Sequence, residues 1–572
     1  MRRMLAGVGF LGLALACGGD PGADEQRILA DEPALPQLRV DLEGSDVAPR
    51  IVGAALVQVP AAQKPMPSLT GSLMLVGRAG GEMAVASPFS LPAVLHIERL
   101  SESPAHETLP LATASLSLYL DAFTPLERVE VIDTAGNVLS ALDAEGFESG
   151  GESPSLRPLA TTSSTAPDVA SLLSEHRNIR FLGREDSPGF ALTNPVIGVV
   201  DEMLDFNPSM ARVVRTGLSI TPKRSLSAIK TIGMARLRDA NIVGAAYGST
   251  VLFNTGYEFE EPVIPRTVVH ESIHAFIYLV DGDGSVPLNL TPWPEEVIAA
   301  ARATIEKFYL QAGLTSVWDQ LHGDAVSENL ASPYGSITAT GFDMTPFNAQ
   351  AAQQGFASAR GSAEAIEDMS EYVARVIVDD TVDVEGRSPV CDEVRSAGSP
   401  FPLTRVLPYA KIKLLEGLEL LTAEQVRACV GQPAIEGPPG IHFDHSDPDL
   451  KIALTSNLNG GFITLDGTRF LGVLAGPSSK QMLIRVLADE AQPRGMYRLD
   501  NIGLFGINAA TNAILYYDEA ILGGARTSER GLVFVTEFSD DRIAGAVFFT
   551  NFRDAFGIVT RSYPLGTFRI DR

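Results

Sequence analysis

The feature that constrains this chain most is a His-Glu-x-x-His motif inside the apolar run of residues 268–280. Side chains four positions apart project from the same face of a helix. The two histidines are His270 and His274, and two imidazoles on one helix face can bind one Zn²⁺ together. Glu271, beside the first histidine, is then placed to take a proton from a water molecule on the metal. The motif predicts a buried helix that carries most of a catalytic zinc site.

The motif lacks a third ligand, and catalytic zinc usually has three protein ligands and one water. Three-histidine sites continue with a glycine and a further histidine, but Ile277 and Val280 occupy those positions here. We therefore expect a carboxylate from a later helix. The candidates are Glu367, within the segment 367–371 (EDMSE), and Glu296, which follows Trp293-Pro294.

The spacing of the acidic residues favours Glu367. Glu367 and Glu371 are four residues apart, so on a helix they share a face, and one can bind the metal while the other supports a ligating histidine. Glu296 follows a proline that starts a helix, where the helix dipole favours acidic residues without any metal. The prediction is that Glu367 is the third ligand, with Glu296 as the alternative.

The N-terminus reads as an export signal. Residues 1–3 are basic, residues 5–16 are an apolar core too short to span a bilayer, and Ala14-Leu15-Ala16-Cys17 resembles a bacterial lipobox. We expect an exported bacterial lipoprotein that is lipidated on Cys17. The lipid would anchor the protein to the outer membrane or the cell surface. A location on the periplasmic face of the outer membrane is an alternative. The alternative is an ordinary cleaved signal peptide with an incidental cysteine.

Charge and cysteine content restrict the partners further. The formal net charge is −26, which disfavours binding to nucleic acid because phosphate backbones repel an acidic chain. Without Cys17, an exported chain retains Cys391 and Cys429, which we expect to form a disulfide rather than two buried thiols. A monomer is expected.

The pattern along the chain predicts a multidomain protein. Residues 1–17 are the signal peptide and 18–38 a flexible tether. Short apolar runs separated by turns indicate β-sandwich-like domains at 39–148 and 440–572, and a Ser/Pro-rich linker spans 149–167. Between them, residues 168–435 are expected to form an α-rich (α+β), zincin-like domain. In addition to the motif helix, the helices predicted in this domain are 168–177, 223–240, 295–311, 363–378, 403–417 and 423–430.

Three segments together resemble a known family. They are the His270-Glu271-x-x-His274 motif, residues 355–360 (GFASAR) and residues 367–374 (EDMSEYVA). They are similar to H-E-F-x-H, G-F-V-S-x-Y-A and E-D-F-A-E in zinc-binding metallopeptidases of bacterial surface lipoproteins. They also resemble the zinc domain of anthrax-lethal-factor-like gluzincins, in which the first glutamate of E-F-F-A-E binds zinc. The resemblance covers about residues 250–430 and implies that Glu367 is a zinc ligand and Glu371 supports the site from behind.

One departure from the family pattern bears on the chemistry. The tyrosine that precedes the acidic motif, and could stabilise an oxyanion, is replaced by Arg360. Arg360 could serve that role electrostatically, or it could be a solvated surface charge. Tyr334, in the segment Ser332-Pro333-Tyr334-Gly335, is a second candidate for stabilising the oxyanion. The alternative is that Tyr334 is an aromatic residue of a loop without a catalytic role.

The expected function is hydrolysis of a peptide or protein substrate by a zinc metallopeptidase with Glu271 as general base. An extended peptide would pair with a strand at 248–254, if that strand lies at a sheet edge. The competing hypothesis is a surface lipoprotein that binds glycan or protein through its β domains and has a structural or degenerate zinc site. Zinc-dependent hydrolysis of a non-peptide amide or ester is a third possibility.

Overall fold

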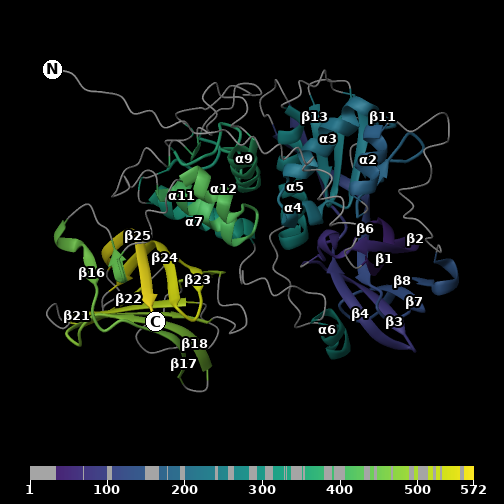
Figure 1. The fold of residues 1–572 in the computed structure, drawn as a ribbon. Helices are drawn as coiled ribbons and strands as arrows, with labels where there is room; N and C mark the ends of the chain where they lie inside the picture. Colours follow the sequence, from purple (N-terminus) through teal and green to yellow (C-terminus); the bar gives the residue numbers. More distant parts are fainter. Residues whose placement is uncertain are drawn as a thin grey trace, which may run out of the picture.

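The computed structural model describes residues 34–68, 70–99, 106–147, 167–176, 178–192, 200–238, 242–255, 263–282, 293–302, 314–327, 329, 331–336, 351, 354–378, 390–391, 394, 406–430, 438–443, 448–465, 468–487, 495–499, 513–519, 524–528, 531–553 and 559–572. These residues form three β-sheets and the helices that pack on the sheets and on one another (Figure 1). The predicted signal segment with Cys17, tether residues 18–33 and linker residues 149–166 lie outside them. No described helix is both long and apolar enough to cross a membrane.

The largest N-terminal element is a ten-stranded sheet. Its order is β11-β12-β14-β13-β5-β6-β1-β2, with β10 beside β6 and β9 beside β12. The strands are β1 (Ala34–Gly44), β2 (Arg50–Pro60), β5 (Val94–Arg99), β6 (His106–Asp121), β9 (Arg180–Leu182), β10 (Phe190–Leu192), β11 (Val200–Leu204), β12 (Thr231–Leu237), β13 (Ile242–Tyr247) and β14 (Thr250–Asn254). Strand β1 begins at Ala34, so residues 34–38 of the predicted tether are strand.

The predicted boundary at residues 149–167 does not separate two sheets. Strand β5, from before the linker, pairs antiparallel with β13, from after it. The block 168–435 was expected to be α-rich, yet it contributes the strands β9 to β14 to this sheet. A Ser/Pro-rich segment indicates a surface connection, and it does not reveal which strands pair across it.

A second sheet packs on the N-terminal strands in a sandwich-like way. It has the order β4-β3-β7-β8, with β3 (Leu73–Ala79), β4 (Glu82–Phe89), β7 (Arg128–Ile132) and β8 (Val138–Asp143). Leu38, Val40 and Leu42 of β1 share one buried core with Leu73 and Leu75 of β3. The predicted two-sheet packing therefore exists, although the larger sheet extends well beyond it.

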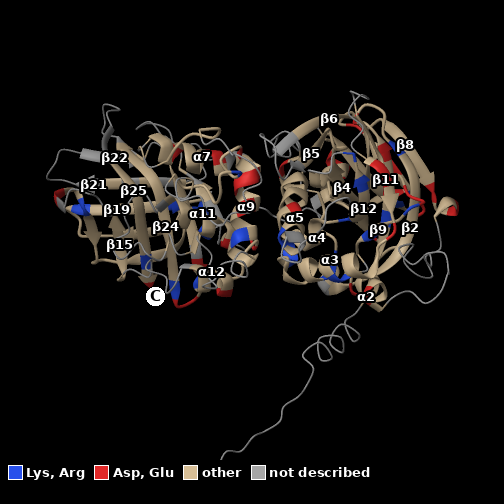
Figure 2. Ribbon diagram, turned by 90° about the horizontal axis from the view of Figure 1, so that it is seen from above, with Lys and Arg blue, Asp and Glu red and all other residues tan. Residues whose placement is uncertain are grey.

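The described residues include nine α-helices. They are α2 (Pro167–Glu175), α3 (Pro208–Ile220), α4 (Lys223–Ala228), α5 (Val263–Asp281), α6 (Glu295–Arg302), α7 (Leu314–Ser327), α9 (Ala365–Val378), α11 (Val406–Gly417) and α12 (Ala423–Val430). Helix α5 contains the His-Glu-x-x-His motif and packs against α3, α4, α9 and the strands β13 and β14. Its neighbours on every side explain why its sequence is apolar all round. Figures 1 and 2 both show α5 and α9 side by side.

Two local predictions near the motif need correction. Residues 223–240 were expected to be one helix, but they form the short helix α4 followed by strand β12. Strand β12 lies between β11 and β14 and is buried on both faces. A strand of this kind has a continuous run of apolar residues, and periodicity alone does not distinguish such a run from a buried helix. The strand predicted at 248–254 is β14, but it pairs with β12 on one side and β13 on the other. An extended peptide therefore cannot add to it as to an edge strand.

The C-terminal region has eleven strands, in the order β16-β15-β25-β24-β22-β21-β19-β18-β17, with β20 and β23 on a branch from β24. The strands are β15 (Gly440–Phe443), β16 (Ile452–Leu454), β17 (Asn459–Leu465), β18 (Thr468–Ala475), β19 (Lys480–Val486), β20 (Gly495–Arg498), β21 (Ala513–Glu519), β22 (Gly524–Ser528), β23 (Leu532–Phe538), β24 (Arg542–Arg553) and β25 (Val559–Asp571). On β23, Val533 and Val535 enter the sheet's own core, whereas Leu532 and Phe534 join the core of the helices. This β-rich region fits the predicted C-terminal sandwich.

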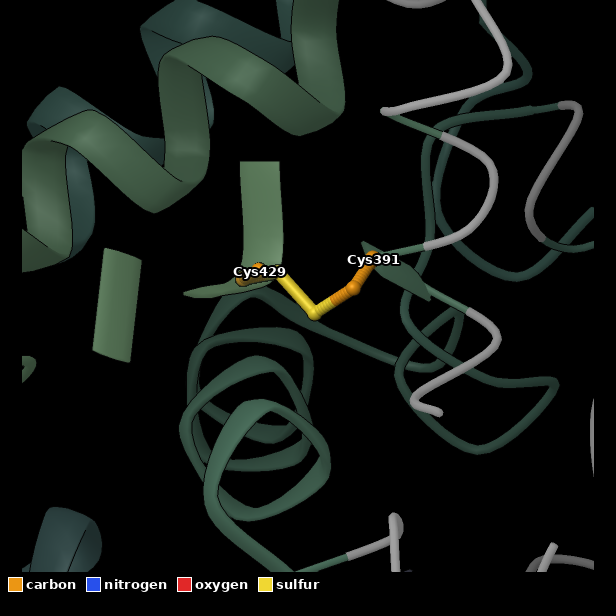
Figure 3. The surroundings of a disulfide bond; sticks show 2 residues. All are labelled: Cys391 and Cys429. Atoms are coloured by element: carbon orange, nitrogen blue, oxygen red, sulfur yellow. A yellow bond between two sulfur atoms is a disulfide. The ribbon is translucent and has the colours of Figure 1, made fainter. Parts of the chain in front are cut away.

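The predicted disulfide is confirmed. Cys391 and Cys429 are bonded, and the bond ties residue 391 to the end of α12 (Figure 3). Both residues are buried in the core of the helices. The bond closes a loop with a sequence separation of 38 residues.

Removing this disulfide should destabilise the protein. A cross-link that closes a loop of this length restricts the unfolded chain and is worth about 3–4 kcal/mol. We expect the Cys391→Ser/Cys429→Ser variant to lose free energy of unfolding by that amount in urea denaturation. Reductant should destabilise the wild type equally and leave the double variant unchanged. An unaltered wild-type transition in reductant would contradict the expectation.

Candidate metal centre

Helices α5 and α9 bring three donor groups together. His270 and His274 extend from α5, and Glu367 extends from the first turn of α9. The two Nε2 atoms are 3.1 Å apart, and the Glu367 carboxylate oxygens lie 3.4 Å from His270 Nε2 and 3.1 Å from His274 Nε2. All three residues are buried, and among the described residues they form a group that could hold a metal ion.

The spacing and chemistry of these donors fit a zinc ion. Zinc binds imidazole nitrogen and carboxylate oxygen at about 2.0–2.2 Å, which places tetrahedral ligands about 3.3 Å apart. The three observed separations of 3.1 to 3.4 Å agree with that value. Two imidazoles and one carboxylate are also a ligand set of catalytic zinc sites.

Glu371 orients His270 from behind. Its Oε1 lies 3.2 Å from His270 Nδ1, while its Oε2 accepts hydrogen bonds from Arg266 (2.7 Å) and Arg375 (3.1 Å). Burial opposes ionisation of this carboxyl, but the two arginines outweigh it and hold the pKa of Glu371 well below its usual value. Because Nδ1 faces a carboxylate, we assign the imidazole proton to Nδ1, which directs the Nε2 lone pair toward His274 and Glu367.

We expect Glu371→Gln to weaken metal binding by about 10–100-fold, the usual effect of losing a group that orients a ligand. The neutral amide no longer fixes the Nδ1–H tautomer and leaves Arg266 and Arg375 without their shared anion. The dissociation constant can be measured by competition with a chromophoric chelator, with circular dichroism to confirm folding. Glu424→Gln, on the exposed side of α12, is the matched control. Equal affinities for the two variants would contradict the role of Glu371.

Glu271 lies between helix α5 and the face of the ten-stranded sheet at β13. It is fully buried on α5, and strand β13 approaches it through Gly244. A Cβ at Gly244 would be 3.5 Å from Glu271 Oε1 and only 3.2 Å from the Leu252 carbonyl oxygen. A glycine within a strand often marks such a close approach, so Gly244 is a signal in the sequence that motif reasoning did not use.

Arg360 lies at the cluster. Its Nε donates a hydrogen bond to Glu367 Oε2 at 2.9 Å, and its side chain is only 10% exposed. The interpretation of Arg360 as a solvated surface charge is therefore wrong. Its positive charge contacts the carboxylate that is the predicted third ligand.

Tyr334 lies elsewhere. Its ring packs against His322 and Phe356, with centroid separations of 4.6 and 5.5 Å. Burial, with help from the charge of Asp368, raises the pKa of Tyr334. Asp368 follows Glu367 in α9 but points to another side of the helix, because successive helix residues are rotated by about 100°. Among the described contacts of Tyr334, none is with His270, His274 or Glu367.

Glu296 does not belong to the cluster. Helix α6 packs on the four-stranded sheet, where Trp293 and Val297 contact Met74 and Val76. Glu296 is exposed on the other side of that helix. The apolar residues on either side of it, Trp293 and Val297, determine the helix orientation, so Glu296 is not the third ligand of this cluster.

His96 is a neighbour that the sequence reasoning missed. It lies on β5, and its ring centroid is 5.2 Å from that of His274. The local sequence indicates only which way His96 points, through the alternation of side chains along a strand. Leu95 and Ile97 enter the core on the opposite face of the sheet, so His96 faces α5.

Comparison of the sequence with protein-family models and with curated proteins finds no match. The three motifs therefore remain a resemblance, and the function has to be argued from the cluster itself.

Proposed function

We propose that this protein is a zinc metallopeptidase in which His270, His274 and Glu367 hold the ion. The observation that carries the proposal is the convergence of these three buried donors beside Glu271. When bound, zinc supplies Lewis-acid chemistry, which polarises a scissile carbonyl and makes water more acidic. The packing of α5 on α9 and on the strands β13 and β14 supports a zincin-like domain, although its sheet is shared with N-terminal strands.

The protein's own residues have separate tasks in this proposal. Glu371 orients His270 through Nδ1. The Glu271 carboxylate takes a proton from the attacking water as the water oxygen bonds to the carbonyl carbon. Glu271 then delivers that proton to the amine nitrogen as the C–N bond breaks. Arg360 supplies positive charge beside Glu367 and, in this scheme, favours the negative oxygen of the transition state.

The proposal extends to location. Residues 1–17 supply an export signal and a lipid-anchored Cys17, and the Cys391–Cys429 bond is consistent with an oxidising compartment. A peptidase held at the membrane by a lipid would act on peptides or proteins outside the cytoplasm.

A peptide-library assay tests the activity. We expect the purified protein to cleave a subset of peptides, to lose cleavage after treatment with a chelator, and to regain it when Zn²⁺ is restored. Mass spectrometry of the products locates the cut bonds. Cleavage that survives complete metal removal would contradict the proposal, as would absence of cleavage across the library in the zinc-loaded protein.

One observation favours a second function. Arg360 stands where the resembling family has a tyrosine, and its ion pair with Glu367 draws electron density from the third ligand. A site of this kind can bind zinc for structure while the β domains bind glycan or protein. Stoichiometric zinc without cleavage of any peptide would support this alternative.

A further inference from the structure

We infer that His96 is a further catalytic residue of this site, a hydrogen-bond donor to the substrate's carbonyl oxygen. The inference rests on the proposed hydrolase function and assigns a role to a residue outside every motif. It also makes the N-terminal strands part of the site.

The sheet register turns His96 toward α5. His96 pairs with Ala246 across β5 and β13, so these two side chains share a face of the sheet. Gly244, two residues from Ala246, is on the same face and lies against Glu271. The imidazole of His96 therefore lies on the sheet face that covers the motif helix.

His96 stands beside the metal ligands without being one of them. Its ring centroid is 5.2 Å from that of His274, much like the 5.0 Å between His270 and His274. However, the described group that could hold an ion comprises His270, His274 and Glu367, and His96 is outside it. His96 is also half-buried, whereas the three ligands are buried. A partly exposed imidazole next to buried metal ligands is in a position to contact a bound substrate.

The chemistry required is simple. As water adds to the scissile carbonyl carbon, the carbonyl oxygen gains negative charge. An N–H of His96 donates a hydrogen bond to that oxygen and keeps its proton, so no atom is transferred. Removing one donor of this kind lowers kcat by about 10²–10³-fold.

The test compares His96→Ala, His96→Gln and the control His442→Ala, which alters a half-buried histidine in the C-terminal sheet. We expect zinc affinity to be the same in all three. His96→Ala should lower kcat by about 10²-fold with little change in KM, and His96→Gln, which keeps an N–H donor, should recover part of it. His442→Ala should match the wild type.

A second readout does not need turnover. Acetohydroxamate binding to the Co²⁺-loaded protein, followed by the visible spectrum, should weaken by about tenfold in His96→Ala, the effect of one lost hydrogen bond. Reduced zinc affinity in His96→Ala would overturn the inference by making His96 a ligand, and unchanged kcat and acetohydroxamate affinity would overturn it by making His96 a bystander. If the wild type binds metal but cleaves nothing, the proposed function fails while the acetohydroxamate titration still decides whether His96 faces a ligand. A wild type that binds no metal would overturn both.

Discussion

Replacing Glu271 with glutamine should lower kcat for peptide hydrolysis by about 10³-fold, in the range lost when a general base is removed. The amide is nearly isosteric with the carboxylate but cannot accept the proton of the attacking water. Glu271 is not a member of the His270, His274 and Glu367 donor group, so the variant should bind zinc as tightly as the wild type. Stopped-time product analysis gives kcat, and metal analysis of the same sample gives zinc per chain.

A substitution on the same helix provides the control. Ser272 follows Glu271, and its hydroxyl donates to the Val269 carbonyl oxygen at 2.6 Å, away from the donor cluster. Ser272→Ala should keep both zinc and activity. Wild-type turnover in Glu271→Gln would exclude Glu271 as the base, and loss of zinc in that variant would show that Glu271 helps to hold the ion.

The second large effect is expected in the core behind α9. Lys411 is fully buried, forms an ion pair with Asp368, and donates to the Gly355 carbonyl oxygen at 2.8 Å. Asp368 also accepts hydrogen bonds from Trp318 Nε1 and the Ala357 backbone N–H, both at 3.1 Å. Lys411→Met leaves the Asp368 charge buried without its cation, so the free energy of unfolding should fall by about 3–5 kcal/mol.

The double variant Lys411→Met/Asp368→Asn separates pairing from packing. It removes both charges and keeps an acceptor for Trp318, so it should recover much of the stability lost by the single variant. Arg238→Met is the matched control, because Arg238 pairs with Asp201 while both side chains are largely exposed (59% and 41%), and it should cost about 0–1 kcal/mol. Urea denaturation measures all three. A single variant no less stable than the control would contradict the account of this pair.

The sequence was sufficient for the parts of the candidate site that depend on local spacing. His270 and His274, and Glu367 and Glu371, are four residues apart, and helical geometry alone places each pair on one face. The count of ligands then indicated that a carboxylate had to come from elsewhere in the chain. The pairing of Cys391 with Cys429 followed from the two cysteines that are left once Cys17 is assigned to the predicted export signal.

The rest depended on packing between distant segments. Nothing in the segment around His96 indicates that β5 pairs with β13, because strand pairing is set by the whole sheet rather than by one strand. The same limit explains why the boundary at 149–167 was placed inside one structural unit. The sequence of strand β12 also fits a helix, because a strand that is buried on both faces lacks the alternation of apolar and polar residues that identifies a half-exposed strand.

X-ray anomalous diffraction at the zinc absorption edge, from crystals of the zinc-loaded protein, shows directly which residues bind the ion. We expect a zinc peak bonded to His270 Nε2, His274 Nε2 and a Glu367 carboxylate oxygen at about 2.0–2.2 Å. A peak bonded to other residues, or no peak at this cluster in zinc-saturated protein, would contradict the proposed zinc site.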